Sequence, residues 1–152
     1  MSNLTVGDAA IAVVRRNTEE VQGKGYWDLF EKLFADDFVD HTPQPGTTPD
    51  KSGVRVLYKR LRAAFPDFRP EIHWQMAAGD LVTTYKTYHG THQGEFLGIP
   101  ATGKKISFYT VDAGSHLSLS RMRSSKRRTR ALFCSAVIRS PDPPAEAAFA
   151  GL

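Results

Sequence analysis

The chain has 152 residues, of which 41% are hydrophobic and 24% are charged, as in one soluble globular domain with a sizeable core. No apolar run approaches the roughly 20 residues of a membrane-spanning helix, and the first residues lack the basic and apolar segments of a secretory signal. The single Cys134 excludes an internal disulfide and fits the reducing cytoplasm, where we expect the protein to reside.

The net charge of +4 is distributed unevenly along the chain. Residues 1–113 contain 13 basic and 14 acidic side chains, which gives −1. Residues 114–152 contain 7 basic and 2 acidic side chains, which gives +5. The excess of positive charge therefore lies in the C-terminal part and says little about what the rest of the chain binds.

The sequence predicts a first helix from Val6 to Gln22. Thr5 and Asp8 have the spacing of a capping box, in which each side chain pairs with an otherwise free backbone amide. Apolar residues then recur at helical spacing until Gly23 ends the helix. A shorter helical segment follows, and its apolar side contains Trp27, Phe30, Leu33 and Phe34.

A third helix is predicted after a short extended piece at residues 38–41 and a turn-rich segment at 42–47. Thr48 is expected as its N-cap and Pro49 as its first residue, where the missing N–H of proline costs nothing. Pro66 ends this helix because proline cannot continue a helical hydrogen-bond pattern.

The hydrophobic period then changes from helical to two, which predicts strands. Ile72, Trp74 and Met76 alternate with polar residues and are therefore expected on one face of a strand. Residues 78–80 are expected to form a hairpin turn into a second strand at 81–89. Helices followed by strands predict an α+β fold, with helices packed on one face of a largely antiparallel sheet.

Three stretches occur in a recognisable order: LFADDFVDH at residues 33–41, RAAFPDF at 62–68 and GTHQGEFLGIPATGK at 90–104. An alternating strand that ends in Asp112 follows the last stretch. Over residues 9–113 the chain resembles the SnoaL-like polyketide cyclases and the related ester cyclases, which have the nuclear transport factor 2-like fold. The resemblance implies a cone-shaped curved sheet, a cystatin-like roll, packed against three N-terminal helices around an apolar pocket.

Asp112 is the main catalytic candidate. It shares strand parity with Ile106, Phe108 and Thr110, so its carboxylate is expected on a largely apolar face. Desolvation there raises the pKa of a carboxyl group and makes it a better proton acceptor near neutrality. The alternative is an Asp that faces water at the end of a strand. The resemblance implies that Asp112 is the general acid/base of an intramolecular aldol ring closure.

Three polar residues are further site candidates. His92 is in the loop before the third strand and is a candidate to stabilise the negative charge of an enolate, with a solvated loop histidine as the alternative. By resemblance His41 lies at the mouth of the pocket; a hydrogen bond to the backbone near Pro43 is the alternative. Asn17 is either a polar anchor in the pocket or an exposed helical residue.

Five aromatic residues are candidates to line a substrate pocket. The alternative assignment is the hydrophobic core, and the two overlap because ligand pockets are mostly apolar. These residues are Trp27, Phe38, Trp74, Tyr88 and Phe96.

Neither a metal nor a cofactor is expected. The five histidines and one cysteine show no spacing typical of a metal site. The glycines of residues 90–104 do not form a phosphate-binding motif.

The resemblance ends sharply after Asp112. We expect one domain over residues 1–138, in which 114–138 are atypical, followed by a flexible tail at 139–152. Residues 121–130 contain six basic side chains, whose mutual repulsion favours a solvated loop. Short strands are possible at 116–120 and 132–138. A shifted reading frame, splicing or true divergence would each produce such a change of sequence.

The leading hypothesis is a small cytoplasmic enzyme that uses general acid/base catalysis for aldol-type cyclisation or isomerisation of a small apolar carbonyl compound. The alternative is a non-catalytic module of the same fold that binds a small molecule. A third hypothesis is a weak contact of residues 121–130 with nucleic acid or another anionic surface. The resemblance also implies a homodimer, because homodimers are common in the fold.

Overall fold

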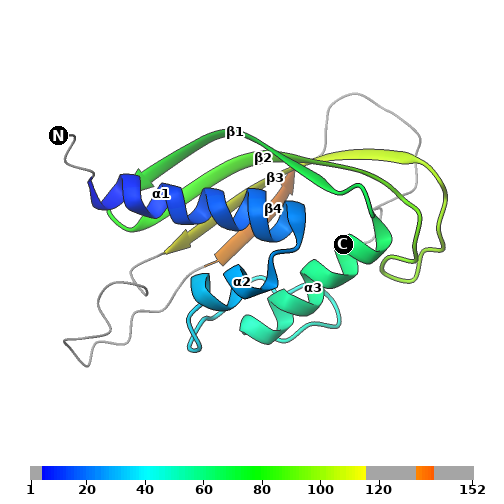
Figure 1. Ribbon diagram of the computed structural model, residues 1–152, viewed down its shortest axis with the longest axis horizontal. Coiled ribbons are helices and arrows are strands. Elements are labelled where there is room, and N and C mark those ends of the chain that lie inside the picture. Colours follow the sequence, from blue (N-terminus) through cyan, green and yellow to red (C-terminus); the bar gives the residue numbers. More distant parts are fainter. Residues whose placement is uncertain (1–4, 116–132, 139–152) are drawn as a thin grey trace.

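The computed structural model describes residues 5–115 and 133–138. The helical elements are α1 (Val6–Arg16), the π-helical segment η1 (Asn17–Gln22), α2 (Trp27–Leu33) and α3 (Lys51–Ala64). The strands are β1 (Arg69–Ala78), β2 (Leu81–Thr91), β3 (Lys105–Ser115) and β4 (Phe133–Ile138). The strands form one curved antiparallel sheet in the order β1-β2-β3-β4, with α1 running along it and α2 and α3 beyond (Figure 1).

This arrangement confirms the predicted α+β fold with three N-terminal helices. Residues 133–138 of the predicted apolar run form β4, which pairs with β3. The possible strand at 116–120, the basic segment 121–130 and the tail 139–152 lie outside the described residues.

The first helical region begins and ends where the sequence predicts. The hydroxyl of Thr5 accepts a hydrogen bond from the Asp8 N–H at 3.1 Å, and the Asp8 carboxylate accepts one from the Thr5 N–H at 2.9 Å. The α-helix gives way at Asn17 to the wider π-helical segment, in which Asn17, Thr18, Val21 and Gln22 are buried. π-Helical turns are often found at functional sites. Here the turn directs two amide side chains, Asn17 and Gln22, into the interior.

The third helix begins two residues later than predicted. Asp50 is the N-cap, and its carboxylate accepts hydrogen bonds from the Gly53 N–H at 2.9 Å and the Thr48 hydroxyl at 2.7 Å. The carbonyl of Pro49 accepts a hydrogen bond from the Asp40 N–H at 3.1 Å, next to the β-bridge between Val39 and Asp50. The prediction for Thr48 and Pro49 was wrong because the bridge between Val39 and Asp50 and the hydrogen bond from Asp40 to Pro49 hold this segment outside the helix.

A β-bulge in β1 changes which face its side chains occupy. β1 and β2 are joined by a tight turn in which Gly79 has a φ of +64°, as the predicted hairpin requires. Ile72 pairs with Lys86 and Trp74 pairs with Tyr85, so one extra residue, His73, lies between the two pairs. Trp74 is thereby turned to the face opposite Ile72, which corrects the predicted alternation.

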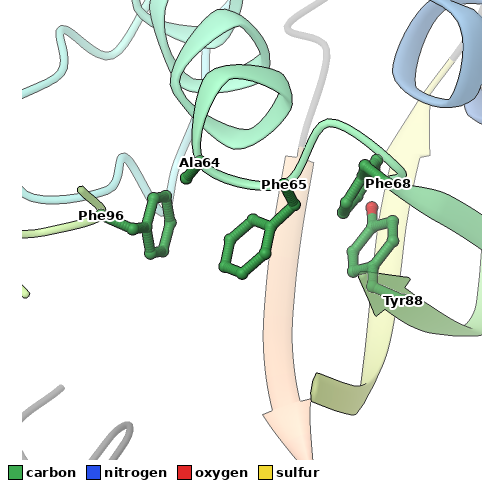
Figure 2. Packing of buried hydrophobic residues seen from close by; sticks show 5 residues of the cluster. All are labelled: Ala64, Phe65, Phe68, Tyr88 and Phe96. Atoms are coloured by element: carbon green, nitrogen blue, oxygen red, sulfur yellow. The ribbon is translucent and has the colours of Figure 1, made fainter. Parts of the chain in front are cut away.

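Two clusters of buried side chains form the core. One lies between η1, α2 and α3 and contains Val21, Phe30, Val54 and Tyr58. The other lies where the end of α3 meets β2 and the loop at residues 92–104, and it contains Ala64, Phe65, Phe68, Tyr88 and Phe96. Figure 2 shows these side chains as neighbouring groups, with ring centroids 5.5 Å apart for Phe65 and Phe96 and 4.8 Å for Phe68 and Tyr88.

The loop at residues 92–104 approaches the end of α3 closely at Gly94. The N–H groups of Gln93 and Gly94 both donate to the Ala64 carbonyl, at 2.9 and 3.0 Å. A Cβ atom on Gly94 would lie 2.6 Å from the Ala63 carbonyl oxygen, which is too close for van der Waals contact.

We expect Gly94→Ala to lower the free energy of unfolding by about 1–3 kcal/mol, because the loop must move away from α3. Gln93→Ala is the matched control, since its exposed side chain should contribute less than about 0.5 kcal/mol. Urea denaturation measures both values. A Gly94→Ala midpoint equal to that of the wild type would contradict the close approach.

Candidate functional site

A buried ion pair lies on the face of the sheet that the helices cover. Lys86 comes from β2 and Asp112 from β3, and their side chains are only 2% and 7% exposed. Thr84 pairs with Asp112 in the sheet and Lys86 pairs with Thr110, so the two charged groups are diagonal neighbours on one face. β3 continues to Ser115. Asp112 therefore faces the interior and not water at the end of a strand.

Gln22 connects this ion pair to the helices. Its side-chain carbonyl accepts hydrogen bonds from the Tyr88 hydroxyl at 2.8 Å and from the Lys86 ammonium at 3.4 Å. Its amide nitrogen donates to the Tyr58 hydroxyl at 2.7 Å, and Asn17 donates to the same hydroxyl at 3.2 Å. These contacts join η1, α3 and β2 in one buried polar network.

The two tyrosines of this network are held in their neutral form. Burial raises the pKa of Tyr88, and the negative charge of Asp112 raises it further. Burial also raises the pKa of Tyr58, with a further contribution from the neighbouring Tyr88. Both side chains therefore remain phenols that can donate a hydrogen bond.

Asp40 is a second acidic group in this interior. The residue is 5% exposed, and its carboxylate accepts a hydrogen bond from the Thr42 N–H at 2.9 Å. Burial raises the pKa of Asp40, the hydrogen bonds from Thr42 and the charge of His41 oppose this effect, and the negative charge of Asp112 adds to it. Asp40 and Asp112 are thus close enough to influence each other electrostatically.

The two predicted histidines occupy different places relative to the ion pair. His92 is buried against Phe65, with ring centroids 5.3 Å apart, and its Nδ1 lies 3.1 Å from the Thr102 hydroxyl. It is eight positions beyond Thr84, the partner of Asp112, which corresponds to about 26 Å along an extended strand. His41 is exposed and lies next to Asp40.

The aromatic candidates are distributed over three places. Tyr88 and Phe96 belong to the core cluster of Figure 2. Trp27 and Phe38 pack against the cluster between the helices. Trp74 is 42% exposed and contacts the ring of Tyr85 on the outer face of the sheet. The described residues therefore do not unite these five side chains in one lining.

Sequence reasoning overlooked three members of the polar network, namely Gln22, Tyr58 and Lys86, and also the buried acid Asp40. Lys86 offered the clearest signal, because it shares strand parity with Val82 and Tyr88, and a charge on an apolar face needs a partner. Asp40 offered no signal in the sequence, since an Asp beside a turn is ordinarily solvated.

A surface hollow of about 320 Å³ lies elsewhere, at the start of α3. Its charged side chains already pair with one another: Glu31 contacts Lys51 at 2.9 Å and Arg55 at 2.7 Å. In residues 5–115 and 133–138, no three histidine, cysteine or acidic side chains are grouped as a metal site would require. In the same part of the chain, no helix is long and apolar enough to cross a membrane.

Comparison with known proteins gives one family and a set of similar structures. The model of the SnoaL-like polyketide cyclases matches residues 12–114. No curated protein matches the chain.

Two similar solved structures are described as proposed polyketide cyclases, each 25% identical to this chain. IdmH from Streptomyces antibioticus has a TM-score of 0.65, with 83% of this chain and 91% of that chain covered. The protein from Acidithiobacillus ferrooxidans has a TM-score of 0.63, with 91% and 92% covered. An epoxide hydrolase from M. tuberculosis, 16% identical, has a TM-score of 0.58 with 87% and 84% covered, which shows the fold alone.

Proposed function

The chain belongs to the SnoaL-like polyketide cyclase family, and we propose that it is an enzyme that moves a proton at a carbon next to a carbonyl group. The substrate is a small apolar carbonyl compound, and the reaction is an aldol-type ring closure or an isomerisation without a cofactor. The observation that supports this proposal is the buried Lys86–Asp112 pair beside the neutral phenol of Tyr88. It brings a proton acceptor and two hydrogen-bond donors together in a site shielded from water.

In this reaction the Asp112 carboxylate accepts the proton from the α-carbon, and the electrons of the C–H bond move to the carbonyl oxygen. The Lys86 ammonium stabilises the enolate oxygen as its charge develops, and the Tyr88 hydroxyl does so when its O–H turns from the Gln22 carbonyl to the substrate. In an aldol closure the enolate carbon then forms a bond to a second carbonyl carbon. The new alkoxide receives the proton from Asp112, which restores the carboxylate.

The proposal gives enolate stabilisation to Lys86 and Tyr88 because both lie in one hydrogen-bonded network with Asp112. The role in enolate stabilisation suggested for His92 and the position of His41 at a pocket mouth stay predictions from the sequence. The pocket itself and the cytoplasmic location also stay predictions.

Proton exchange at carbon tests the proposal without knowledge of the natural substrate. 2-Tetralone, an apolar ketone with acidic α-protons, is dissolved in D2O with the protein, and the α-proton signals are followed by NMR. We expect these signals to disappear faster than in buffer alone. A non-catalytic binding module, the alternative function, would shift the ligand signals without accelerating exchange.

The outer face of the sheet supports a second proposal, a homodimer. Trp74 and Met76 are 42% and 63% exposed on this face, and the rings of Tyr85 and Tyr109 stack beside them at 5.8 Å. Contiguous exposed apolar side chains mark interaction surfaces. We propose that two copies pack this face against each other.

Trp74→Lys is therefore expected to convert a dimer into a monomer, because it places a charge in the centre of the apolar face. Val56→Lys is the matched control, since Val56 is an exposed apolar residue on α3. Sedimentation velocity measures the mass of the wild type and of each variant in solution. A wild-type monomer, or a Trp74→Lys variant that stays dimeric, would contradict the proposed interface.

A further inference from the structure

Gln22 is held in place by two residues of α3, Tyr58 and Arg62. The side-chain amide of Gln22 donates to the Tyr58 hydroxyl at 2.7 Å, and Arg62 donates to the backbone carbonyls of Gln22 at 3.1 Å and Gly23 at 2.7 Å. Tyr58 and Arg62 are four positions apart and therefore lie on one side of the helix. Gln22 itself is only 3% exposed. Both its backbone and its side chain are thus fixed by contacts to one neighbouring helix.

The direction of the Gln22 side chain follows from the group that faces it. An ammonium group can only donate hydrogen bonds, so the atom of Gln22 that lies 3.4 Å from the Lys86 nitrogen must be the carbonyl oxygen. The amide nitrogen then points to Tyr58, and the Tyr88 hydroxyl, 2.8 Å from the same carbonyl oxygen, must donate to it. One acceptor atom therefore brings together two donors that lie two positions apart on one face of β2.

The carbonyl of Gln22 is a neutral acceptor, whereas Lys86 also contacts the charged carboxylate of Asp112. A charged acceptor binds an ammonium group more strongly than a neutral one does. Gln22 can therefore orient the Lys86 ammonium without removing it from Asp112. A glutamate in its place would instead compete with Asp112 for the same cation.

We propose that Gln22 is the positioning residue of this site: it holds the Lys86 ammonium and the Tyr88 hydroxyl side by side, so that a substrate oxygen can accept from both. This inference rests on the proposed function, in which these two donors stabilise the enolate. Donors that are fixed before the reaction stabilise developing charge most effectively. Gln22 acts through the donors and does not itself touch the reacting atoms. Tyr58 in turn fixes the direction of the Gln22 amide.

The contact that fixes the amide can be measured without any substrate. In protein labelled with ¹⁵N-glutamine, the side-chain NH2 resonance of Gln22 is the one absent from Gln22→Met. We expect its protons to exchange with solvent more slowly than those of the exposed Gln93, because the Gln22 amide is buried and hydrogen-bonded. In Tyr58→Phe the resonance should shift. An NH2 group that exchanges as fast as that of Gln93, or that Tyr58→Phe leaves unchanged, would overturn the proposal.

Exchange of 2-tetralone tests the positioning role, with each variant shown to be folded by near-UV circular dichroism. We expect Gln22→Met, which keeps a side chain of similar size but offers no carbonyl oxygen, to reduce the rate about tenfold. Tyr58→Phe removes one oxygen atom and leaves both donors in place, and it should reduce the rate about threefold or more. Gln93→Met, which changes an exposed glutamine, is the matched control and should behave as the wild type.

A double-variant cycle separates positioning from a purely structural role. If Tyr58 acts on the reaction through Gln22, Tyr58→Phe should change the rate of the Gln22→Met protein by less than about twofold, because the amide that Tyr58 holds is absent. Independent structural effects would instead give the same factor in both backgrounds. That result, or an unaltered Gln22→Met rate beside wild-type exchange, overturns the role of Gln22 alone. A wild type that accelerates no exchange overturns the proposed function and this role together.

Discussion

Lys86→Met is expected to lower the free energy of unfolding by about 3–5 kcal/mol, because it leaves the Asp112 carboxylate buried without its counter-charge. Methionine keeps most of the apolar stem of lysine, so the main change is the loss of the ammonium group with its contacts to Asp112 and Gln22. The cost is large because neither group can reach water: the two side chains are 2% and 7% exposed. Chemical denaturation in urea measures the loss.

The double variant Lys86→Met/Asp112→Leu removes both charges and should cost less than the sum of the two single changes. Lys51→Met is the control, since Lys51 pairs with Glu31 and Asp36, which are 45% and 97% exposed. Exposed pairs of this kind contribute at most about 1 kcal/mol. A Lys86→Met variant as stable as the Lys51→Met variant would show that the interior pair is hydrated in solution.

Asp112→Asn is expected to reduce the rate of α-proton exchange by about 10²–10⁴-fold, the usual contribution of a general base. Asparagine preserves the shape of the side chain and can still accept a hydrogen bond from Lys86, but it cannot hold the α-proton. The variant leaves the Lys86 ammonium without its counter-charge and should lose stability for the same reason as Lys86→Met, so near-UV circular dichroism must show that it is folded under the conditions of the rate measurement. Acetate added to Asp112→Gly should restore part of the rate if the missing group is a carboxylate.

The sequence predicted the features of the fold that depend on neighbours in the chain. Thr5 and Asp8 predicted the start of α1, because a capping box needs only residues three positions apart. Strand parity predicted that Asp112 faces the interior, since side chains alternate strictly along a regular strand such as β3.

Features that depend on distant contacts could not be predicted in this way. The bulge at His73 adds one residue opposite β2, and no local pattern shows where a strand gains an unpaired residue. Thr48 and Pro49 have the local signature of a helix start, which the hydrogen bond from Asp40 to Pro49 overrides.

Most of the candidate site also depends on contacts between residues that are distant in the sequence. Asp112 was found from parity, but its partners Lys86 and Gln22 are 26 and 90 positions away in the chain. Only the pairing of β2 with β3 and the packing of η1 against them bring these groups together. The segment around Asp40 is held by the bridge between Val39 and Asp50, which periodicity does not reveal.

In the proposed function, the buried carboxylate of Asp112 moves a proton at a carbon next to a carbonyl group. The most direct test is the rate at which 2-tetralone loses its α-protons in D2O, measured by NMR for the wild type and Asp112→Asn at the same protein concentration. We expect an exchange rate well above that of buffer for the wild type and a rate near that of buffer for the folded variant. Equal rates for the two proteins would contradict it.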